Sequence, residues 1–466
     1  MPEHKVLIIG GGPGGFETAI RLNQYGIDCA VVEMERLGGV CLNWGCIPTK
    51  ALVKSSELYT EMKSAAAYGF PPVDPRLDYS LVFERKNAVV EQLVGGVEHL
   101  FRKRGIPVIR EKAISVSALD KGYEVVTAAG TAIRAEYLVL ATGSLPKELP
   151  QVKIDEHAVL SSTGILALDK LPNSLAIVGG GVIGCEFASI LNSFGVQVTV
   201  IEFLPRILAT EDEEIGKRLS LALKKAGIKI LTGLGVESAA CGDQGCELSL
   251  SDGSRLSFEK VLLSVGRVPR CDLEWAGNGP QLERGAVAID DKMRTSLNGV
   301  YAIGDLTAKL PLAHTATKQG MMVAAHIRSQ VQGVEYTHPN LDYANIPRCT
   351  FTYPELASVG YTETEAREKF GNIKVGKFPY SANGKALAMS STYGMVKTVS
   401  RTDDSTLVGM HILGHSAAEL IAQGALMLSL GAKDDVAQAV TFAHPTLSET
   451  IKESLEDLHS LAINKI

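Results

Sequence analysis

The sequence predicts an α/β protein with two related, parallel strand–helix–strand domains and a separate C-terminal α+β domain. A chain of 466 residues is long enough for about three domains of ordinary size. Two segments, Lys5–Glu33 and Ser174–Glu202, repeat the same order of apolar run, glycine-rich turn, helical pattern and second apolar run. From about Pro339 onward, strand-like runs such as MVKTVS alternate with helical stretches such as AAELIAQGALMLSL.

The first repeat carries the glycine pattern G-x-G-x-x-G at Gly10, Gly12 and Gly15. We expect the first glycine to permit a sharp turn, the second to let the backbone approach a pyrophosphate, and the third to let the helix pack on the strand. The helix N-terminus then offers N–H groups and partial positive charge to the phosphates. Glu33 ends the next strand, where a carboxylate binds ribose hydroxyls. The complete order favours a bound dinucleotide over a tight turn without a ligand.

The second repeat has the same pattern at Gly179, Gly181 and Gly184, with Glu202 as its distal acid. A carboxylate in this place accepts bonds from ribose hydroxyls and repels a 2′-phosphate, which favours NAD over NADP. Arg206 lies nearby and could favour NADP, but we interpret it as a solvated charge. A chain with two such domains commonly holds FAD in one and NAD in the other.

The remaining pattern divides the chain further. A helical pattern runs from about Leu93 to Arg104, short strands are expected in Val108–Gly130, and buried strands that end in turns are expected in Glu136–Pro146, Lys260–Pro269 and Gly299–Leu306. The predicted domains are residues 1–147 and 269–338 for the first dinucleotide-binding (Rossmann-like) domain, 148–268 for the second, and 339–466 for the third.

Composition excludes several classes of function. Apolar residues make up 45% and charged residues 21% of the chain, an ordinary globular balance. The net charge of −6 argues against general nucleic-acid binding and against adhesion to an anionic membrane. No apolar run approaches the roughly 20 residues that span a bilayer. The N-terminus does not resemble a signal peptide, so we expect a cytoplasmic protein, although a transit peptide removed before this numbering stays possible.

The eight cysteines do not suggest a secreted disulfide scaffold, and none has zinc-ligand spacing, so no metal site is expected. Cys41 and Cys46 lie at the entry to a predicted helix, where a thiolate is stabilised and disulfide exchange is favoured. Cys241 and Cys246 have the same spacing but lie in a probable hairpin with polar turn residues, so we interpret them as incidental. We expect small buried side chains at the other positions, Cys29, Cys185, Cys271 and Cys349.

The segment GGVCLNWGCIPTK, Gly38 to Lys50, resembles the redox-disulfide motif of the class I flavoprotein disulfide reductases. Similar motifs run along nearly the whole chain, namely Ala141–Ser144, Gly266–Pro269, Tyr301–Asp305, Leu312–His314 and Ala443–Glu449. Together they look most like the dihydrolipoamide-oxidising branch, the flavin component of 2-oxoacid dehydrogenase and glycine cleavage complexes. The resemblance implies FAD, NAD, a homodimer, a redox-active Cys41–Cys46 disulfide and lipoyl-bearing partner proteins.

The resemblance also implies roles for single residues. Asp305 would bind the flavin's ribityl region, and the helix that starts near His314 would direct its positive end at the flavin's pyrimidine edge. Lys50 would lie by the flavin's central nitrogen and pair with Glu186; the alternative for both is surface charge. The implied cofactor-binding set is completed by Thr142, Gly143, Ser144, Gly266 and Ala313.

By the same resemblance, His444 is the acid–base and Glu449 orients its ring, and the pair acts on the disulfide of the other subunit of a homodimer. The alternative is that Thr446 and Glu449 are only a capping box that opens the last helix. The family often has a second histidine two positions before the catalytic one. Here Phe442 occupies that position, which leaves the polarity of the substrate pocket open.

These motifs predict that the chain oxidises dihydrolipoamide through Cys41–Cys46 and FAD and reduces NAD to NADH. Glutathione and trypanothione reductases share the architecture but favour NADP, which Glu202 disfavours. Two alternatives stay open. One is an NADH-dependent reductase of another small disulfide, and the other is a non-catalytic flavoprotein subunit of an assembly.

Overall fold

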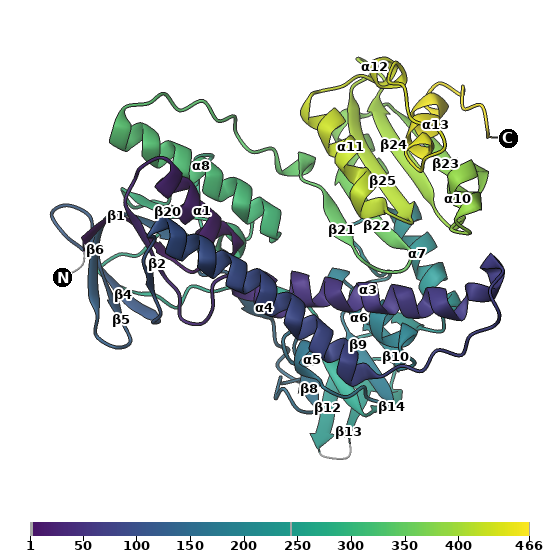
Figure 1. Ribbon diagram of the computed structural model, residues 1–466, viewed down its shortest axis with the longest axis horizontal. Coiled ribbons are helices and arrows are strands. Elements are labelled where there is room, and N and C mark those ends of the chain that lie inside the picture. Colours follow the sequence, from purple (N-terminus) through teal and green to yellow (C-terminus); the bar gives the residue numbers. More distant parts are fainter. Residues whose placement is uncertain (1–2, 243–244, 466) are drawn as a thin grey trace. The chain divides into compact units, whose positions relative to one another are not determined.

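The computed structural model describes residues 3–242 and 245–465, and the chain forms two compact units, shown in Figure 1. Unit 1 contains Met1–Ala51, Ser80–Lys147 and Gly266–Tyr343. Unit 2 contains Leu52–Tyr79, Glu148–Val265 and Ala344–Ile466. In the part of the chain that the structure describes, every helix is too short or too polar to cross a membrane.

The main sheet of unit 1 has the strand order β17–β4–β5–β6–β1–β2–β3, and β20 also pairs with β6. Its strands are β1 (Glu3–Ile9), β2 (Cys29–Val32), β3 (Val108–Ile109), β4 (Ala113–Ala118), β5 (Tyr123–Thr127), β6 (Ala132–Leu140), β17 (Glu274–Ala276) and β20 (Val300–Ala302). A ribbon of β7 (Ser144–Pro146) and β16 (Arg267–Pro269) and the pair β18 (Leu282–Glu283) and β19 (Ala286–Val287) complete its strands. Residues 1–147 and 269–338, which the sequence assigns to one domain, therefore both contribute strands to this sheet.

Helices α1 (Pro13–Gln24) and α8 (Ala313–Gln332) pack against each other in unit 1, as Figure 1 shows. Glycine makes this approach possible, because a Cβ at Gly14 would lie 3.2 Å from the Cβ of Ala316. The other helices that begin or run in this unit are α2 (Gly39–Trp44), α3 (Cys46–Lys63) and α4 (Tyr79–Arg104). The helix expected at Leu93–Arg104 thus starts earlier, because Val90 continues the buried stripe of Val94, Val97 and Phe101.

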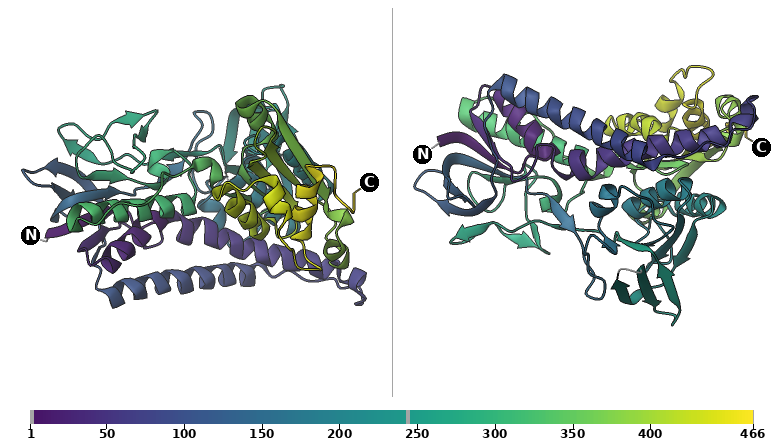
Figure 2. Two further views of the ribbon diagram at one scale, coloured as in Figure 1. Left: turned by 90° about the horizontal axis from the view of Figure 1, so that it is seen from above. Right: turned by 60° about the horizontal axis from the view of Figure 1, so that its bottom comes forward.

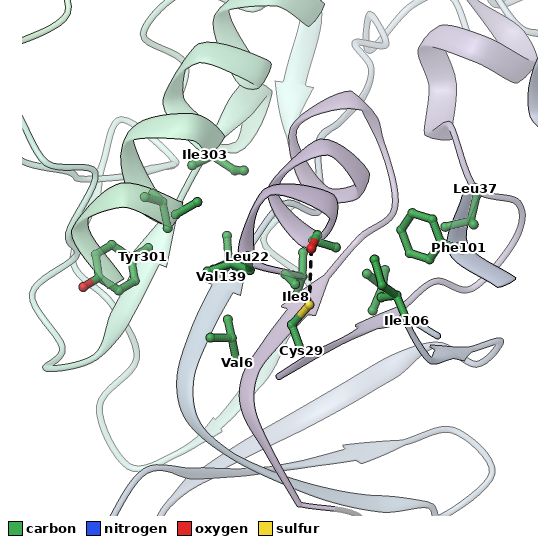
Figure 3. Close-up of a cluster of buried hydrophobic side chains, with 14 of the residues drawn as sticks. Val6, Ile8, Leu22, Cys29, Leu37, Phe101, Ile106, Val139, Tyr301 and Ile303 are labelled. Carbon is green, nitrogen blue, oxygen red and sulfur yellow. Dashed lines mark hydrogen bonds between the residues drawn. The ribbon is translucent and has the colours of Figure 1, made fainter. Parts of the chain in front are cut away.

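The core of unit 1 lies on both faces of β1, which is typical of a parallel strand. Val6 and Ile8 face one cluster, drawn in Figure 3, while Leu7 and Ile9 face the other. Cys29 belongs to the first cluster, and its thiol donates to the Ala19 carbonyl oxygen at 3.4 Å. Burial raises the pKa of this thiol to about 12, so Cys29 is an inert packing residue, as expected from the sequence.

Unit 2 contains a parallel sheet of order β11–β10–β9–β15–β8, a small antiparallel sheet β12–β13–β14, and an antiparallel sheet β21–β22–β25–β24–β23. The strands of the first two sheets are β8 (Val159–Leu160), β9 (Ser174–Val178), β10 (Gln197–Glu202), β11 (Lys229–Thr232), β12 (Val236–Gly242), β13 (Gly245–Leu250), β14 (Arg255–Phe258) and β15 (Lys260–Leu263). Those of the third are β21 (Arg348–Thr350), β22 (Glu355–Gly360), β23 (Ile373–Pro379), β24 (Met395–Arg401) and β25 (Leu407–Gly414).

The helices that lie wholly in unit 2 are α5 (Gly164–Ala167), α6 (Val182–Ser193), α7 (Glu213–Lys225), α9 (Glu363–Phe370), α10 (Gly384–Ala388), α11 (Ala417–Ser429), α12 (Asp434–Gln438) and α13 (Glu449–Asp457). Figures 1 and 2 show α11 and α13, in yellow-green and yellow, against the C-terminal antiparallel sheet. Leu420, Ile421, Ile451 and Leu455 from these helices share one core cluster with the strands. This arrangement agrees with the α+β domain that the sequence predicts.

A buried ion cluster joins α7 to the C-terminal sheet of unit 2. Asp212 caps α7 by accepting from the backbone N–H groups of Glu214 and Ile215. Lys397 on β24 is 2% exposed, and its Nζ lies 2.9 Å from Asp212 and 2.7 Å from Glu363. Burial alone would raise the pKa of Asp212, but the nearby His411 and Lys397 hold it below its ordinary value. Sequence analysis did not identify this cluster, because its members lie far apart along the chain.

Candidate active site

The first glycine turn connects β1 to α1, and two of its glycines are required by the protein itself. Gly10 has a φ of +106°, and a Cβ there would lie 2.3 Å from the carbonyl oxygen of Ala141. A Cβ at Gly15 would lie 1.9 Å from the carbonyl oxygen of Gly10. At Gly12 the nearest heavy atom to a Cβ is 4.0 Å away, so this glycine faces open space at the start of α1. The turn therefore leaves room for a phosphate where the N–H groups of α1 are unpaired.

Glu33 stands at the end of β2 and is tied to this turn. Its Oε2 accepts from the N–H of Gly11 at 2.6 Å, and its Oε1 accepts from the N–H of Glu35 at 2.9 Å. Burial raises the pKa of the carboxyl above its ordinary value, although the backbone N–H groups oppose this effect. The carboxylate is thus fixed at the first glycine turn, where the sequence predicts contact with a ribose.

The second glycine turn, between β9 and α6, repeats this geometry in unit 2. Gly179 has a φ of +107°, and a Cβ there would lie 2.4 Å from the carbonyl oxygen of Ser264. A Cβ at Gly184 would lie 2.1 Å from the carbonyl oxygen of Gly179. A Cβ at Gly181 would meet nothing within 4 Å. The internal repeat seen in the sequence is therefore a repeat of backbone geometry.

Glu202 at the end of β10 corresponds to Glu33. Its Oε2 accepts from the N–H of Gly180 at 2.5 Å, and its Oε1 accepts from the N–H of Leu204 at 2.7 Å. The prediction that Arg206 is a solvated charge is wrong. Its half-buried guanidinium donates to the carbonyl oxygens of Leu208 and Ala209 at 3.0 and 2.6 Å, because the chain turns back on itself there.

The Cys41–Cys46 disulfide is present and is attached to the first glycine turn. Cys41 lies on α2 and Cys46 begins α3, with their Cα atoms 4.7 Å apart. The loop before α2 contacts the turn directly, since the N–H of Gly38 donates to the carbonyl oxygen of Gly11 at 2.8 Å. The N-terminus of α3 favours a thiolate at Cys46 when the bond opens.

Asn43, between the two cysteines, is a residue that sequence analysis missed. Its buried side-chain amide donates from Nδ2 to the carbonyl oxygens of Leu37 and Gly39, at 3.1 and 3.0 Å. The amide therefore holds the short helix α2 against the loop that touches the glycine turn. The asparagine in CLNWGC is visible in the sequence, but its role depends on two backbone acceptors whose positions are known only from the structure.

A polar cluster in unit 1 contains Ser144 and Asp305. The Ser144 hydroxyl donates to the Asp305 carboxylate, and Arg267 donates from Nε to the Ser144 hydroxyl oxygen at 2.7 Å. Burial lowers the pKa of Arg267, and Asp305 opposes this effect. Sequence analysis placed Arg267 within a motif but gave it no role. Gly143 and Gly266, which bound the β7–β16 ribbon, have φ values of +74° and +117°, so each expected long strand is broken in two here.

The connectors around this cluster are held together by their own bonds. The Thr142 hydroxyl donates to the carbonyl oxygen of Arg270 at 2.6 Å. Asp305 lies on a 3₁₀ turn, Gly304–Thr307, whose first N–H donates to Gln319 on α8 at 2.7 Å. Since α8 begins at Ala313 and packs on α1, the acidic turn, the α8 start and the first glycine turn belong to one packed assembly.

Lys50 and Glu186 fall in different units. Lys50 is half-buried on α3 in unit 1. Glu186 on α6 in unit 2 is 5% exposed, and its Oε1 accepts from the N–H of Phe351 at 2.9 Å. The surface-charge alternative is therefore wrong for Glu186. The Lys50–Glu186 pair itself stays a prediction.

The His444–Glu449 dyad is formed within unit 2. Nδ1 of His444 lies 2.9 Å from Oε1 of Glu449, and the imidazole side chain is 78% exposed. Oε2 of Glu449 accepts from the N–H of Thr446 at 2.8 Å. Burial alone would raise the pKa of Glu449, but the Thr446 N–H and His444 hold it below its ordinary value.

One of the two hydrogen bonds of a capping box is present at the Glu449 carboxylate. The Glu449 side chain satisfies the Thr446 N–H, as such a box requires, but the Thr446 hydroxyl donates to the carbonyl oxygen of Ala443 instead. Helix α13 begins at Glu449 itself. One carboxylate thus holds both the loop backbone and the histidine ring, so the geometry accommodates both interpretations.

The other cysteines differ in part from expectation. Cys241 and Cys246 form a second disulfide across the predicted hairpin, whose polar tip residues Asp243 and Gln244 lie outside the described residues. Cys185 is buried like Cys29, and burial raises the pKa of its thiol. Cys271 is exposed and Cys349 is partly exposed, so the expectation of burial is wrong for both. Across residues 3–242 and 245–465, no group of three or more His, Cys, Asp or Glu side chains is placed to hold a metal ion.

Comparison with known proteins matches the chain in two parts. Residues 4–320 match the family described as pyridine nucleotide-disulphide oxidoreductase, and residues 346–455 match the dimerisation domain of the same family. Two proteins named dihydrolipoyl dehydrogenase are full-length relatives. The Bacillus subtilis protein is 39% identical over 97% of both chains, and the Zymomonas mobilis protein is 36% identical over 100% of both.

Solved structures agree with this match. The HOCl-induced flavoprotein disulfide reductase RclA from Escherichia coli has a TM-score of 0.84 and 26% identity, and the alignment covers 97% of this chain and 99% of that one. LpdA from Mycobacterium tuberculosis has a TM-score of 0.88 at 24% identity over 98% and 100% of the two chains, which shows the same fold.

Proposed function

Because the chain belongs to the family of pyridine nucleotide-disulphide oxidoreductases, we propose that it is a dihydrolipoyl dehydrogenase, which oxidises dihydrolipoamide to lipoamide and reduces NAD to NADH. The observation that carries this proposal is the Cys41–Cys46 disulfide, whose supporting loop is bonded to the first glycine turn. Such a reaction requires a disulfide that accepts electrons from a dithiol and lies beside a dinucleotide site.

The residues fit FAD in unit 1 and NAD in unit 2. Gly12 leaves an open place at the start of α1, Glu33 offers a fixed carboxylate, and Ser144 and Asp305 form a polar pair near the start of α8. Bound FAD supplies the transfer of two electrons from a dithiol to a nicotinamide. The full FAD-binding set that we propose is Gly10, Gly12, Gly15, Glu33, Lys50, Thr142, Gly143, Ser144, Gly266, Asp305 and Ala313. For NAD the set is Gly179, Gly181, Gly184 and Glu202.

The dithiol step follows from the two cysteines. One substrate thiolate attacks the sulfur of Cys41, the Cys41–Cys46 bond breaks, and Cys46 leaves as a thiolate at the positive end of α3. The second substrate sulfur then attacks the first, which releases lipoamide and the Cys41 thiolate. The substrate loses two electrons and the enzyme disulfide gains them. Cys41 is the sulfur attacked because the helix terminus makes Cys46 the better leaving group.

His444 accepts the proton that the attacking thiol must lose. Its ring is oriented through Nδ1 by Glu449, which leaves Nε2 free to face a substrate. The exposure of the ring supports the proposal that it acts on the disulfide of the partner subunit. The dimerisation-domain match over residues 346–455, a range that contains both residues of the dyad, supports a homodimer. Lys50 and Glu186 complete the proposed catalytic set as a charge pair near the flavin.

The names of the relatives support two further parts of the proposal. Dihydrolipoyl groups in such systems are carried by proteins, so we propose lipoyl-bearing partners from a 2-oxoacid dehydrogenase or glycine cleavage complex. We also propose a cytoplasmic location, where the buried thiols of Cys29 and Cys185, which form no disulfide, would be kept reduced.

A substrate panel tests the proposed function. The purified holoenzyme is assayed with dihydrolipoamide and NAD, and in reverse with lipoamide, glutathione disulfide or cystine and each reduced nicotinamide. We expect turnover to be fastest with the lipoyl pair and NAD. Faster turnover with another disulfide would identify a different reductase, for which Phe442 in place of a histidine would be a physical reason. FAD-loaded protein without turnover would indicate a non-catalytic subunit.

A further inference from the structure

A second disulfide lies outside the active site, on the β12–β13 hairpin of unit 2. Cys241 and Cys246 are direct partners in the antiparallel ladder, between the pairs Ala240–Glu247 and Gly242–Gly245. This hairpin contains no residue of the two glycine turns, of helices α2 and α3, or of the His444–Glu449 dyad. The proposed reaction therefore makes no use of these two sulfurs.

The two cysteines differ in access to solvent. Cys241 is exposed, whereas Cys246 is 3% exposed and belongs to the core cluster that contains Leu248 and Val261. A thiolate from solution can reach the Cys241 side of the bond, and Cys246 is then the leaving group. The sulfur of Cys246 lies 3.9 Å from the carbonyl oxygen of Ala158, which can accept the thiol hydrogen after the bond opens. The reduced form therefore has a place for its buried thiol.

The surroundings of the bond favour a redox role over a structural one. A disulfide that closes so short a loop constrains the unfolded chain least, and the hairpin is already held by its ladder hydrogen bonds. Accessible disulfides in a reducing compartment are usually transient and redox-sensing. Cys29 and Cys185 provide the contrast, because both are buried and burial raises the pKa of each thiol.

We propose that Cys241 and Cys246 form a second dithiol–disulfide exchange site, which is reduced by small dithiols and oxidised by small disulfides. In reduction, a dihydrolipoamide thiolate attacks the Cys241 sulfur, the Cys241–Cys246 bond breaks, and Cys246 takes up a proton. The second dihydrolipoamide sulfur then closes the lipoamide ring and releases Cys241. Two electrons and two protons pass from the dithiol to the hairpin. In oxidation, glutathione disulfide accepts them and yields two glutathione molecules.

Differential alkylation of the holoenzyme tests the site without any variant. The enzyme is equilibrated with excess glutathione disulfide or excess dihydrolipoamide, quenched in acid and alkylated, and the peptides are read by mass spectrometry. We expect both hairpin cysteines to be protected after glutathione disulfide and both to be alkylated after dihydrolipoamide. Alkylation of both after the oxidant, or protection of both after the reductant, would overturn the proposal. The separate peptide of Cys41 and Cys46 reports the active site in the same sample.

Two single variants test which sulfur is the entry point. With glutathione disulfide, Cys246→Ser should trap one glutathionyl group on Cys241, whereas Cys241→Ser should trap none on the buried Cys246. Equal trapping in both variants would contradict the assigned entry sulfur. Cys271→Ser is the matched control, because it removes another exposed cysteine and should leave hairpin alkylation unchanged. Neither hairpin variant should change turnover of dihydrolipoamide.

Discussion

Replacement of Glu449 by Gln tests whether this carboxylate orients a catalytic histidine or only caps a helix. The perturbation removes a negative charge 2.9 Å from Nδ1 of His444 and keeps the side-chain length. A hydrogen bond to a charged group contributes about 1.5–3 kcal/mol, and about 1.4 kcal/mol is a factor of ten in rate. Because the imidazole is 78% exposed, solvent screening favours the lower end. We therefore expect kcat/KM for dihydrolipoamide to fall about tenfold.

The pH profile separates the two roles of Glu449. Without the carboxylate, the imidazole loses the group that orients its ring, so kcat/KM should be lower at every pH at which Glu449 of the wild type is ionised. The folded protein holds the pKa of Glu449 below its ordinary value of 4.5, so its contribution to stability is present above that pH. That contribution is lost as the pH falls through the lowered value, and the difference in thermal stability between wild type and Glu449→Gln should shrink there.

The measurements are steady-state kinetics and thermal unfolding. The kinetics cover about pH 5 to 9, a range around the ordinary imidazole pKa of about 6.5. Glu456→Gln is a matched control, because it removes the same charge from α13 without contacting His444; its partner is Lys452. The control should keep the wild-type pH profile. If Glu449→Gln lowers the melting temperature but leaves kcat/KM unchanged, the carboxylate does not orient the histidine and is only a cap.

Three further changes have expected outcomes. Gly15→Ala should abolish FAD retention, measured as flavin per protein, because its Cβ would lie 1.9 Å from the Gly10 carbonyl oxygen. The control Gly95→Ala, in open space on α4, should retain FAD. Equal retention of FAD in both variants would contradict the steric argument. Glu202→Ala should narrow the preference for NAD over NADP in kcat/KM, and an unchanged ratio would remove Glu202 from the ribose site. Lys397→Met should lower the free energy of unfolding by about 3–5 kcal/mol, because it leaves the buried Asp212 unpaired. Lys377→Met, which breaks a partly exposed pair with Glu214, should cost about 0–1 kcal/mol in the same urea titration, and similar losses would argue against burial as the cause.

The third glycine of each turn could be predicted from sequence because its requirement is local. Gly15 must be glycine because of the carbonyl oxygen of Gly10, and Gly184 because of that of Gly179, so each constraint is contained in a few consecutive residues. The acid at the end of the following strand was predictable for the same reason. The two strand–turn–helix repeats followed from the repetition of this unit, and the C-terminal antiparallel sheet with its helices followed from the change of pattern after Pro339.

Features that depend on the path of the backbone or on distant partners could not be predicted. Arg206 was assigned to solvent because its acceptors are the backbone carbonyl oxygens of Leu208 and Ala209, whose positions depend on how the chain turns and not on residue type. Asp212 and Lys397 are ordinary charges in the sequence and become a buried pair only when α7 meets β24. The first half of α4 was missed because charged residues such as Glu84 and Arg85 interrupt its buried stripe.

The two disulfides share one sequence spacing, yet their backbones give them different chemistry. Cys46 begins a helix, whose N–H groups and dipole stabilise the thiolate that leaves when the bond is attacked. Cys246 lies in a strand among apolar side chains, where a leaving thiolate has no comparable support. Because exchange is faster when the leaving group is the more stable thiolate, dihydrolipoamide should open Cys41–Cys46 first and Cys241–Cys246 more slowly. Spacing alone therefore does not identify a redox centre, since the position of the leaving sulfur in a helix or a strand decides how readily the bond exchanges.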